Sequence, residues 1–216
     1  MKPKRIFLIR HGESEGNVNK EVYNTVPDWQ ISLTELGKQQ AANAAEQFYR
    51  EVGIEDVMIY ASPWARARQT AAPFRIPEYQ ASPMVRYIED PRLREQEWGN
   101  YQESELKKKI RVERKKYGSF FYRIPFGESG ADVYDRVTTF FDTMYRDFKK
   151  PDFPQNVLIV SHGLTIKAFL MRWFHLSVEW FDKIDTPENC QLIEMELQAN
   201  GKYVLKTELK EDEESF

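Results

Sequence analysis

Two histidines stand directly after apolar segments and carry the clearest chemical signal in the sequence. His11 lies in Arg10-His11-Gly12, after the apolar run 6–9, and His162 lies in Ser161-His162-Gly163, after the run 157–160. His175, the third histidine, has no such neighbours. A neutral imidazole is a nucleophile near neutral pH and accepts a phosphoryl group when cations neutralise the phosphate oxygens. The paired motifs therefore point to phosphoryl chemistry.

Cations for such chemistry occur beside the first motif and in a third segment. The guanidinium of Arg10, which directly precedes His11, has the forked geometry that matches a phosphate. The segment SPWARARQT at 62–70 follows another apolar run and contains Arg66 and Arg68. Side chains two positions apart leave a helix in different directions. We therefore expect one of these arginines to bind phosphate and the other to be a surface charge.

The elements that must position these residues alternate between short apolar runs and helical patterns, which is typical of α/β proteins. We expect strands at 6–9, 57–61 and 157–160, a helix that follows a capping box at 32–35 and ends near Val52, helices at 133–148 and 164–174, and two final strands at 190–197 and 203–209. These elements predict a single domain over residues 1–210. The remaining residues, 211–216, are expected to form an acidic, disordered tail.

The order of these elements predicts where the two histidines meet. The run 157–160 lacks polar alternation, as does a parallel strand that is covered on both faces. Ligands of open α/β sheets bind beyond the carboxyl ends of the strands, where a glycine lets backbone approach the ligand. If the two strands are neighbours, His11 and His162 face each other at that edge.

Composition limits the partners and the compartment. The chain has 216 residues, of which 41% are hydrophobic, a formal net charge of −3 and one cysteine, Cys190. This charge argues against nucleic acid and anionic membranes as partners, and a single cysteine excludes an internal disulfide and a Cys-rich metal site. The apolar run after MKPKR is too short for a signal peptide or a membrane span. We expect a soluble, cytoplasmic protein.

Six segments in a fixed order resemble the motifs of one known family. They are RHGESEGN, LTELGKQQA, ASPWARARQTA, LREQEWGNYQ, GESGADVYDRV and VSHGLTIKAFL, and they cover most of the chain from residue 7 to about 170. In this order they are similar to the histidine phosphatase superfamily, also called the phosphoglycerate mutase-like family, and most of all to its compact phosphatase-like branch. The resemblance implies a three-layer α/β/α sandwich with a mainly parallel central sheet.

The resemblance also implies separate roles for the two histidines. His11 matches the nucleophile that becomes phosphorylated, and Arg10, Arg66 and His162 match residues that hold the phosphoryl group. Glu95 matches the acid that protonates the leaving oxygen; from chemistry alone, Glu13, Glu89 and Glu97 are equal candidates. Further substrate contacts are expected at Ser14, Asn17, Gly163 and Leu164.

Three functions are open at this stage. The first is a metal-independent phosphomonoester hydrolase with a phosphohistidine intermediate, because the sequence offers no cluster of carboxylates and histidines for a metal and we expect no cofactor. The second is a phosphoglycerate-type mutase, which the short interval between Glu95 and His162 disfavours. The third is a catalytically silent protein that binds a phosphorylated ligand, which the filled catalytic positions disfavour.

The segment between these motifs has a character of its own. Lys107 to Lys116, KKKIRVERKK, contains seven basic residues and one acidic residue, and the aromatic run 120–122 follows. One interpretation is a solvated helix face; the other is a cationic, aromatic rim that selects a polyanionic or bulky phosphorylated substrate. Nucleic-acid binding is a weaker third interpretation, because the overall charge is negative.

Overall fold

One mixed sheet forms the centre of the protein in this computed structural model, which describes residues 2–75, 84–99 and 104–211. Within these residues the strands are β1 (Arg5–Arg10), β2 (Val57–Ala61), β3 (Val85–Glu89), β4 (Asn156–Ser161), β5 (Leu192–Leu197) and β6 (Tyr203–Leu205). Their order is β3-β2-β4-β1-β5-β6. The first four run parallel, and β5 and β6 add an antiparallel pair at one edge. The predicted mainly parallel sheet is confirmed.

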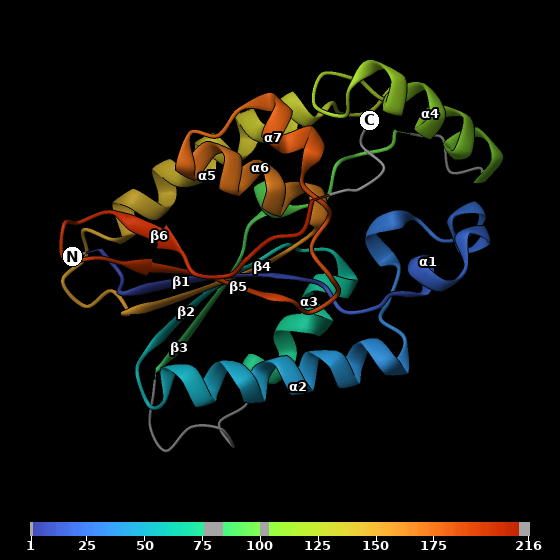
Figure 1. Cartoon of the computed structure of the whole chain (residues 1–216). Helices are drawn as coiled ribbons and strands as arrows, with labels where there is room; N and C mark the ends of the chain where they lie inside the picture. The colour runs from blue at the N-terminus through green and yellow to red at the C-terminus, as the bar shows by residue number, and fades with distance from the viewer. Residues whose placement is uncertain (1, 76–83, 100–103, 212–216) are drawn as a thin grey trace.

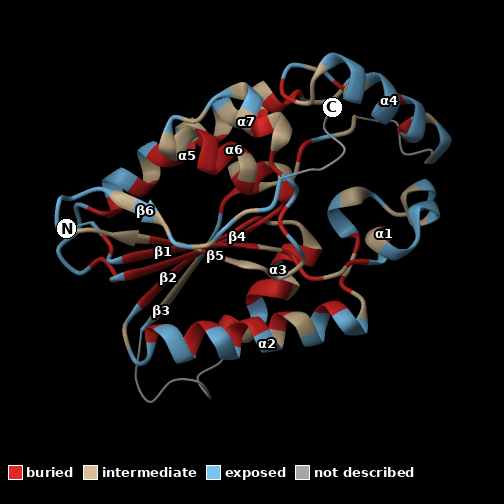
Figure 2. Ribbon diagram, in the orientation of Figure 1, coloured by how far each residue is buried: buried red, intermediate tan, exposed pale blue. Residues whose placement is uncertain are grey.

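Helices cover both faces of the sheet, so the predicted three layers are confirmed (Figure 1). The helices are α1 (Glu15–Val18), α2 (Glu35–Val52), α3 (Ala65–Ala71), α4 (Ser104–Tyr117), α5 (Gly130–Asp147), α6 (Gly163–Phe174) and α7 (Val178–Lys183). The side chains of a strand point alternately to its two faces. Ile6 and Leu8 of β1 therefore pack with α5 and α6, whereas Phe7 and Ile9 pack with α2 and α3. Figure 2 shows the buried residues concentrated along the sheet and the inner helix faces.

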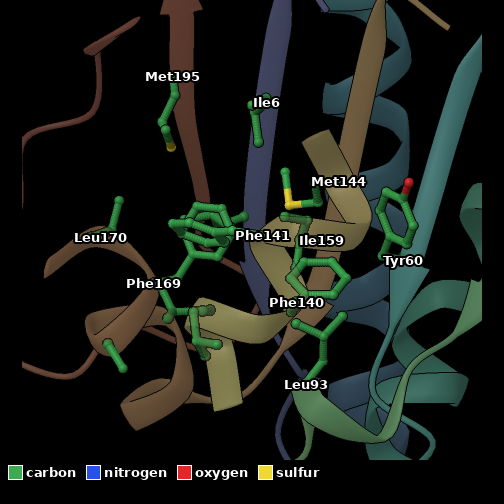
Figure 3. Packing of buried hydrophobic residues seen from close by; sticks show 14 of the residues in the cluster. Ile6, Tyr60, Leu93, Phe140, Phe141, Met144, Ile159, Phe169, Leu170 and Met195 are labelled. Carbon is green, nitrogen blue, oxygen red and sulfur yellow. The ribbon is translucent and has the colours of Figure 1, made fainter. Parts of the chain in front are cut away.

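The larger of the two cores lies between the sheet and α5 (Figure 3). Apolar residues of α5 recur at spacings of three and four, as on one face of an amphipathic helix. Phe140, Phe141 and Met144 belong to this pattern and are buried. Tyr145 also fits the pattern, but 46% of its surface is exposed. The helix begins at Gly130, earlier than predicted, because Ser129 caps it and accepts a hydrogen bond from the backbone N–H of Asp132.

The helix expected to end near Val52 is confirmed as α2, whereas its cap and the ends of the last two strands differ from the prediction. Thr34 caps α2, because its side chain accepts a hydrogen bond from the backbone N–H of Gly37, and the helix starts after it rather than at the proposed box of 32–35. The strand expected from Cys190 begins at Leu192, because Cys190 has a φ of 56°, which a strand does not allow. The last strand ends at Leu205 rather than at residue 209.

The carboxyl edge of the parallel strands is surrounded by elements other than the main layers. The one-turn helix α1 and α4 lie on the same side of the molecule in Figure 1. Between α1 and α2 the chain forms two 3-10 turns, η1 (Lys20–Asn24) and η2 (Asp28–Gln30), and α4 contacts η1. Two further 3-10 turns, η3 (Ala72–Arg75) and η5 (Pro91–Leu93), follow α3 and β3.

Two further expectations concern the end of the chain and membranes. Of the acidic segment 211–216, only Glu211 is described, and it pairs with Ile184; residues 212–216 lie outside the described residues. Among the described helices, none combines the length and the apolar character needed to cross a bilayer.

Candidate active site

The register of two neighbouring strands brings the two histidines together. β1 and β4 are adjacent and parallel, with Arg10 opposite Ser161, so His11 and His162 follow at the same level. The backbone N–H of His11 donates to the carbonyl of Ser161 at 3.0 Å, and the two imidazole centroids are 5.2 Å apart. The prediction that the two histidines face each other is confirmed.

His11 is held in the form that a nucleophile requires. Its Nδ1 lies 2.8 Å from the carbonyl oxygen of Gly12, which can only accept, so Nδ1 carries the proton. Nε2 keeps its lone pair and accepts a hydrogen bond from Nε of Arg66 at 3.3 Å. Burial, followed by the charges of Arg66 and Arg10, lowers the pKa of His11 well below its usual value. The imidazole is therefore neutral at physiological pH.

His162 has a ring nitrogen without a hydrogen-bond partner among the described residues, and its ring lies beside that of His11. It is fully buried at the start of α6, and its Nε2 lies 2.8 Å from the hydroxyl of Ser62. Its Nδ1 is buried without a hydrogen-bond partner among the described residues. Burial, the charge of Arg66 and the neighbouring His11 lower the pKa of His162 well below its usual value. In the tautomer in which the Ser62 hydroxyl donates to Nε2, the proton of the neutral ring is on Nδ1, where it can donate to a phosphate oxygen.

Arg66 and Arg68 differ in exposure, and Arg68 is the surface charge that the sequence predicted for one of them. Arg66 is 4% exposed, and its NH1 contacts both the backbone carbonyl of Asp28 at 2.7 Å and the Oδ1 atom of that residue at 2.9 Å. Arg68 points to solvent. Arg10 donates from NH1 to the carbonyl of Pro187 at 2.7 Å, while its buried Nε has no hydrogen-bond partner among the described residues. Arg10 and Arg66 therefore bring fixed positive charge to the histidine pair.

Glu95 lies in the same space, on the segment that follows β3 and η5. The hydroxyls of Ser161 and Thr165 donate to the carbonyls of residues 93 and 94 and fix this segment against β4 and α6. Burial raises the pKa of Glu95, against the lowering effect of a hydrogen bond from the backbone N–H of Gln96 and of nearby arginines. A carboxyl group with a raised pKa keeps its proton longer and can act as a general acid.

Arg10, Arg66 and Glu95 line a cavity of about 430 Å³ that we call the cationic cavity, whereas His11 and His162 are not among its lining residues. Its lining includes seven cationic residues, which are Arg10, Lys20, Arg66, Lys107, Arg111, Arg114 and Lys167. Its carboxylates are those of Asp28, Glu95, Asp182 and Asp185. The excess of positive charge over negative charge suits an anionic ligand.

The basic segment of α4 has one face toward the cationic cavity and one toward solvent, so the two interpretations, a cationic rim and a solvated face, each apply to part of it. Lys107, Arg111 and Arg114, at helical spacings of four and three, line the cationic cavity. Lys107 is 5% exposed, its Nζ lies 3.8 Å from the ring centre of Tyr23, and burial lowers its pKa to about 8. Lys108 and Lys109 point to solvent. One face of the helix therefore belongs to the cavity and the other is a solvated surface.

The other proposed substrate contacts are not all in the cavity. Asn17, Gly163 and Leu164 line it, but Ser14 does not. Ser14 is 1% exposed, and its hydroxyl donates to Oδ1 of Asn17 at 2.9 Å, so its place is beside a lining residue.

The two motif glycines serve packing as well as access. A Cβ atom at Gly12 would lie 2.5 Å from the carbonyl oxygen of Gly37, and one at Gly163 would lie 2.2 Å from Cγ2 of Thr186. Gly12 is therefore needed because the first turn of α2 approaches it closely. The expectation that this glycine lets the backbone approach a ligand is corrected accordingly.

Several cavity residues were not selected from the sequence. Lys20 and Tyr23 lie in η1, a segment that carries no motif. Arg114 is one of seven basic residues in 107–116, and only the helix register distinguishes it from Lys115 and Lys116.

Across the described residues, no group of three or more His, Cys, Asp or Glu side chains is arranged to hold a metal ion.

Comparisons with known proteins agree with this geometry. The family model described as "Histidine phosphatase superfamily (branch 1)" matches residues 6–210. Phosphoglycerate mutase-like protein AT74 of Arabidopsis thaliana is 39% identical, over 98% of this chain and 70% of the relative. Broad-range acid phosphatase DET1 of Saccharomyces cerevisiae is 30% identical, over 96% of this chain and 90% of the relative.

Solved structures share the fold. Mycobacterial glucosyl-3-phosphoglycerate phosphatase superposes with a TM-score of 0.71 at 23% identity, over 94% of this chain and 97% of the other. This match supports the α/β/α architecture.

Proposed function

The chain belongs to the histidine phosphatase superfamily, branch 1, and we propose that it is a metal-independent phosphomonoester hydrolase that works through a phosphohistidine on His11. The observation that carries the proposal is the state of His11, whose Nδ1 is bonded to a carbonyl and whose Nε2 lone pair lies beside Arg66. Glu95, a carboxyl group with a raised pKa, lines the cationic cavity together with Arg10 and Arg66.

The first half of the proposed reaction transfers the phosphoryl group to the protein. Nε2 of His11 attacks phosphorus, the bond between phosphorus and the ester oxygen breaks, and Glu95 gives its proton to that oxygen. The guanidinium groups of Arg10 and Arg66 and the Nδ1–H of His162 stabilise the charge on the phosphoryl oxygens. The products of this half are the free alcohol and phosphohistidine.

The second half returns the protein to its starting state. The Glu95 carboxylate takes a proton from water as the water oxygen attacks phosphorus. The bond between phosphorus and Nε2 then breaks, inorganic phosphate leaves, and both His11 and Glu95 recover their original protonation. No step in this cycle calls for a metal ion or a cofactor.

A mutase is the second candidate, because a relative that is 39% identical is named phosphoglycerate mutase-like. A mutase must return the phosphoryl group to a bound acid before water reaches it. The interval between Glu95 and His162 is short for that task, which favours hydrolysis. The third candidate, a silent phospholigand-binding protein, is disfavoured because every catalytic position holds a competent residue.

The substrate we propose is a small phosphorylated molecule that carries a second anionic group. The support is the cationic face of α4, where Lys107, Arg111 and Arg114 line the same cavity as Arg10 and Arg66. Nucleic acid and membranes are not proposed as partners, given the net charge of −3. A cytoplasmic location is part of the proposal and is in keeping with a single cysteine.

The direct test is phosphate release from an aryl phosphate in the presence of a chelator. The wild type is expected to release phosphate, and His11→Asn is expected to abolish release. His175→Asn is the matched control, because His175 caps the far end of α6, whereas His11 follows β1 and lies beside His162. Absence of hydrolysis by the wild type across a broad panel of esters would refute the proposal. Interconversion of phosphoglycerates without phosphate release would support the mutase instead.

A further inference from the structure

A second cleft lies beside the cationic cavity and takes no part in the proposed mechanism. It has a volume of about 390 Å³, and its walls come from η1, η2 and the turn between them, from Trp64 after β2, and from residues 97–99. Three of the five tryptophans of the chain line it, which are Trp29, Trp64 and Trp98. We call it the tryptophan cleft.

The tryptophan cleft is adjacent to the phosphoryl site. Tyr23, Asp28 and Trp98 line both the cleft and the cationic cavity. The ring centroid of Trp64 lies 5.2 Å from that of His162, and the guanidinium carbon of Arg66 lies 4.7 Å from the Trp64 centroid. A group attached to a phosphoryl oxygen at the histidine pair is therefore within reach of the cleft wall.

The chemistry of the cleft is unlike that of its neighbour. Among the described residues that line it there is no lysine or arginine, and the charged ones are the carboxylates Asp28 and Glu97. Trp29 leaves 55% of its surface exposed, so its indole is accessible to a ligand in the cleft. Aromatic side chains bind flat rings by stacking, and carboxylates accept hydrogen bonds from ring amino groups.

We propose that the tryptophan cleft binds a nucleobase-like heteroaromatic ring carried by the leaving group of the substrate. The ring stacks on the indoles, its amino groups donate to Asp28 and Glu97, and the ester phosphate reaches His11. This inference rests on the proposed phosphatase function for the identity of the substrate. The binding of a ring to the cleft does not depend on that function and is tested separately.

The first experiment measures binding without catalysis. Adenosine and ribose are titrated into the full-length protein by isothermal titration calorimetry. Adenosine is expected to bind and ribose is not. Trp29→Ala is expected to weaken adenosine binding by on the order of tenfold, and Trp29→Phe, which keeps a ring, by less. Tyr117→Ala is the matched control, because Tyr117 is 71% exposed and lines neither the cavity nor the cleft.

The second experiment links the cleft to catalysis. Adenosine 5′-monophosphate and ribose 5-phosphate present the same ester and differ only in the base. The nucleotide is expected to have the higher kcat/KM, by on the order of tenfold or more. Trp29→Ala is expected to remove this preference and leave hydrolysis of ribose 5-phosphate unchanged.

The outcomes separate the two proposals. If neither ester is hydrolysed but adenosine binds through Trp29, the phosphatase proposal fails and the ring site stands. Equal kcat/KM for the two esters, or an equal loss of both in Trp29→Ala, overturns the inference that the cleft serves the leaving group. Failure of adenosine to bind, or binding that Trp29→Ala leaves unchanged, overturns the ring site itself.

Discussion

Replacing Lys107 by methionine should selectively impair substrates with two anionic groups. Lys107→Met keeps an unbranched side chain at a position that is 5% exposed, and it removes the charge that faces the cationic cavity. Lys108→Met is the matched control on the same helix, because Lys108 points to solvent and pairs with Glu105. Both variants lose one lysine, so a difference between them reports the direction of the side chain.

The size of the effect follows from where Lys107 lies. Two opposite charges about 4 Å apart attract by about 4 kcal/mol at an effective dielectric constant of about 20. When an anion binds to an exposed lysine, the cost of removing water from the ammonium group offsets part of this attraction. Lys107 has already given up much of its hydration, as the lowering of its pKa to about 8 indicates. A contribution of about 1.5 to 3 kcal/mol remains for a hydrogen bond to a charged group, or roughly 10- to 150-fold in affinity.

The assay compares a bisphosphate with its matching monophosphate. For glucose 1,6-bisphosphate, Lys107→Met should raise KM by roughly 10- to 150-fold, whereas KM for glucose 6-phosphate should change little and Lys108→Met should resemble the wild type. The wild-type preference for the bisphosphate should also fade as the pH rises through about 8, because Lys107 loses its proton there. Equal losses for both substrates, or equal losses in both variants, would refute the assignment of Lys107 to a second anion.

Three further predictions concern the acid, the second histidine and a helix cap. Because burial raises the pKa of Glu95 and the protonated form is the acid, kcat/KM for alkyl phosphates should fall as the pH rises through that pKa; a profile still showing this limb in Glu95→Gln would contradict it. Ser62→Ala should lower kcat by about tenfold or more, because Nε2 of His162 loses the hydroxyl that orients its ring; an unchanged kcat would show that Ser62 has no part in the mechanism. Thr34→Ala should lower the free energy of unfolding, measured in urea, by about 1 kcal/mol and Ser32→Ala by less, because Thr34 caps α2. A larger loss in Ser32→Ala would show that Ser32 is the cap instead.

The parallel strands and the histidine pair were predictable because each rests on a local signal. The runs 57–61 and 157–160 are apolar without interruption, and the structure places β2 and β4 there. The pairing of His11 with His162 then needed only that β1 and β4 be neighbours. β3 was missed, because its residues 85–89, VRYIE, contain two charges and none of them is fully buried.

The α4 side of the cationic cavity and the tryptophan cleft could not be predicted from the sequence. Three residues of the basic segment turn toward the cavity because of the helix register, and that register depends on the burial of Ile110 and Lys107 against the rest of the protein. The tryptophan cleft is built from three separate segments around residues 29, 64 and 98. Only the tertiary fold brings these segments together, so composition and spacing carry no sign of the cleft.

Trapping the covalent intermediate tests the central claim most directly. An aryl phosphate has a good leaving group, so Glu95→Gln should still transfer phosphate to the protein, while the loss of the base slows the attack by water. Intact-protein and peptide mass spectrometry after an alkaline quench should then find one phosphoryl group on the peptide that contains His11. The same adduct on Glu95→Gln protein that also carries His11→Asn, or no adduct at all during turnover, would contradict the account.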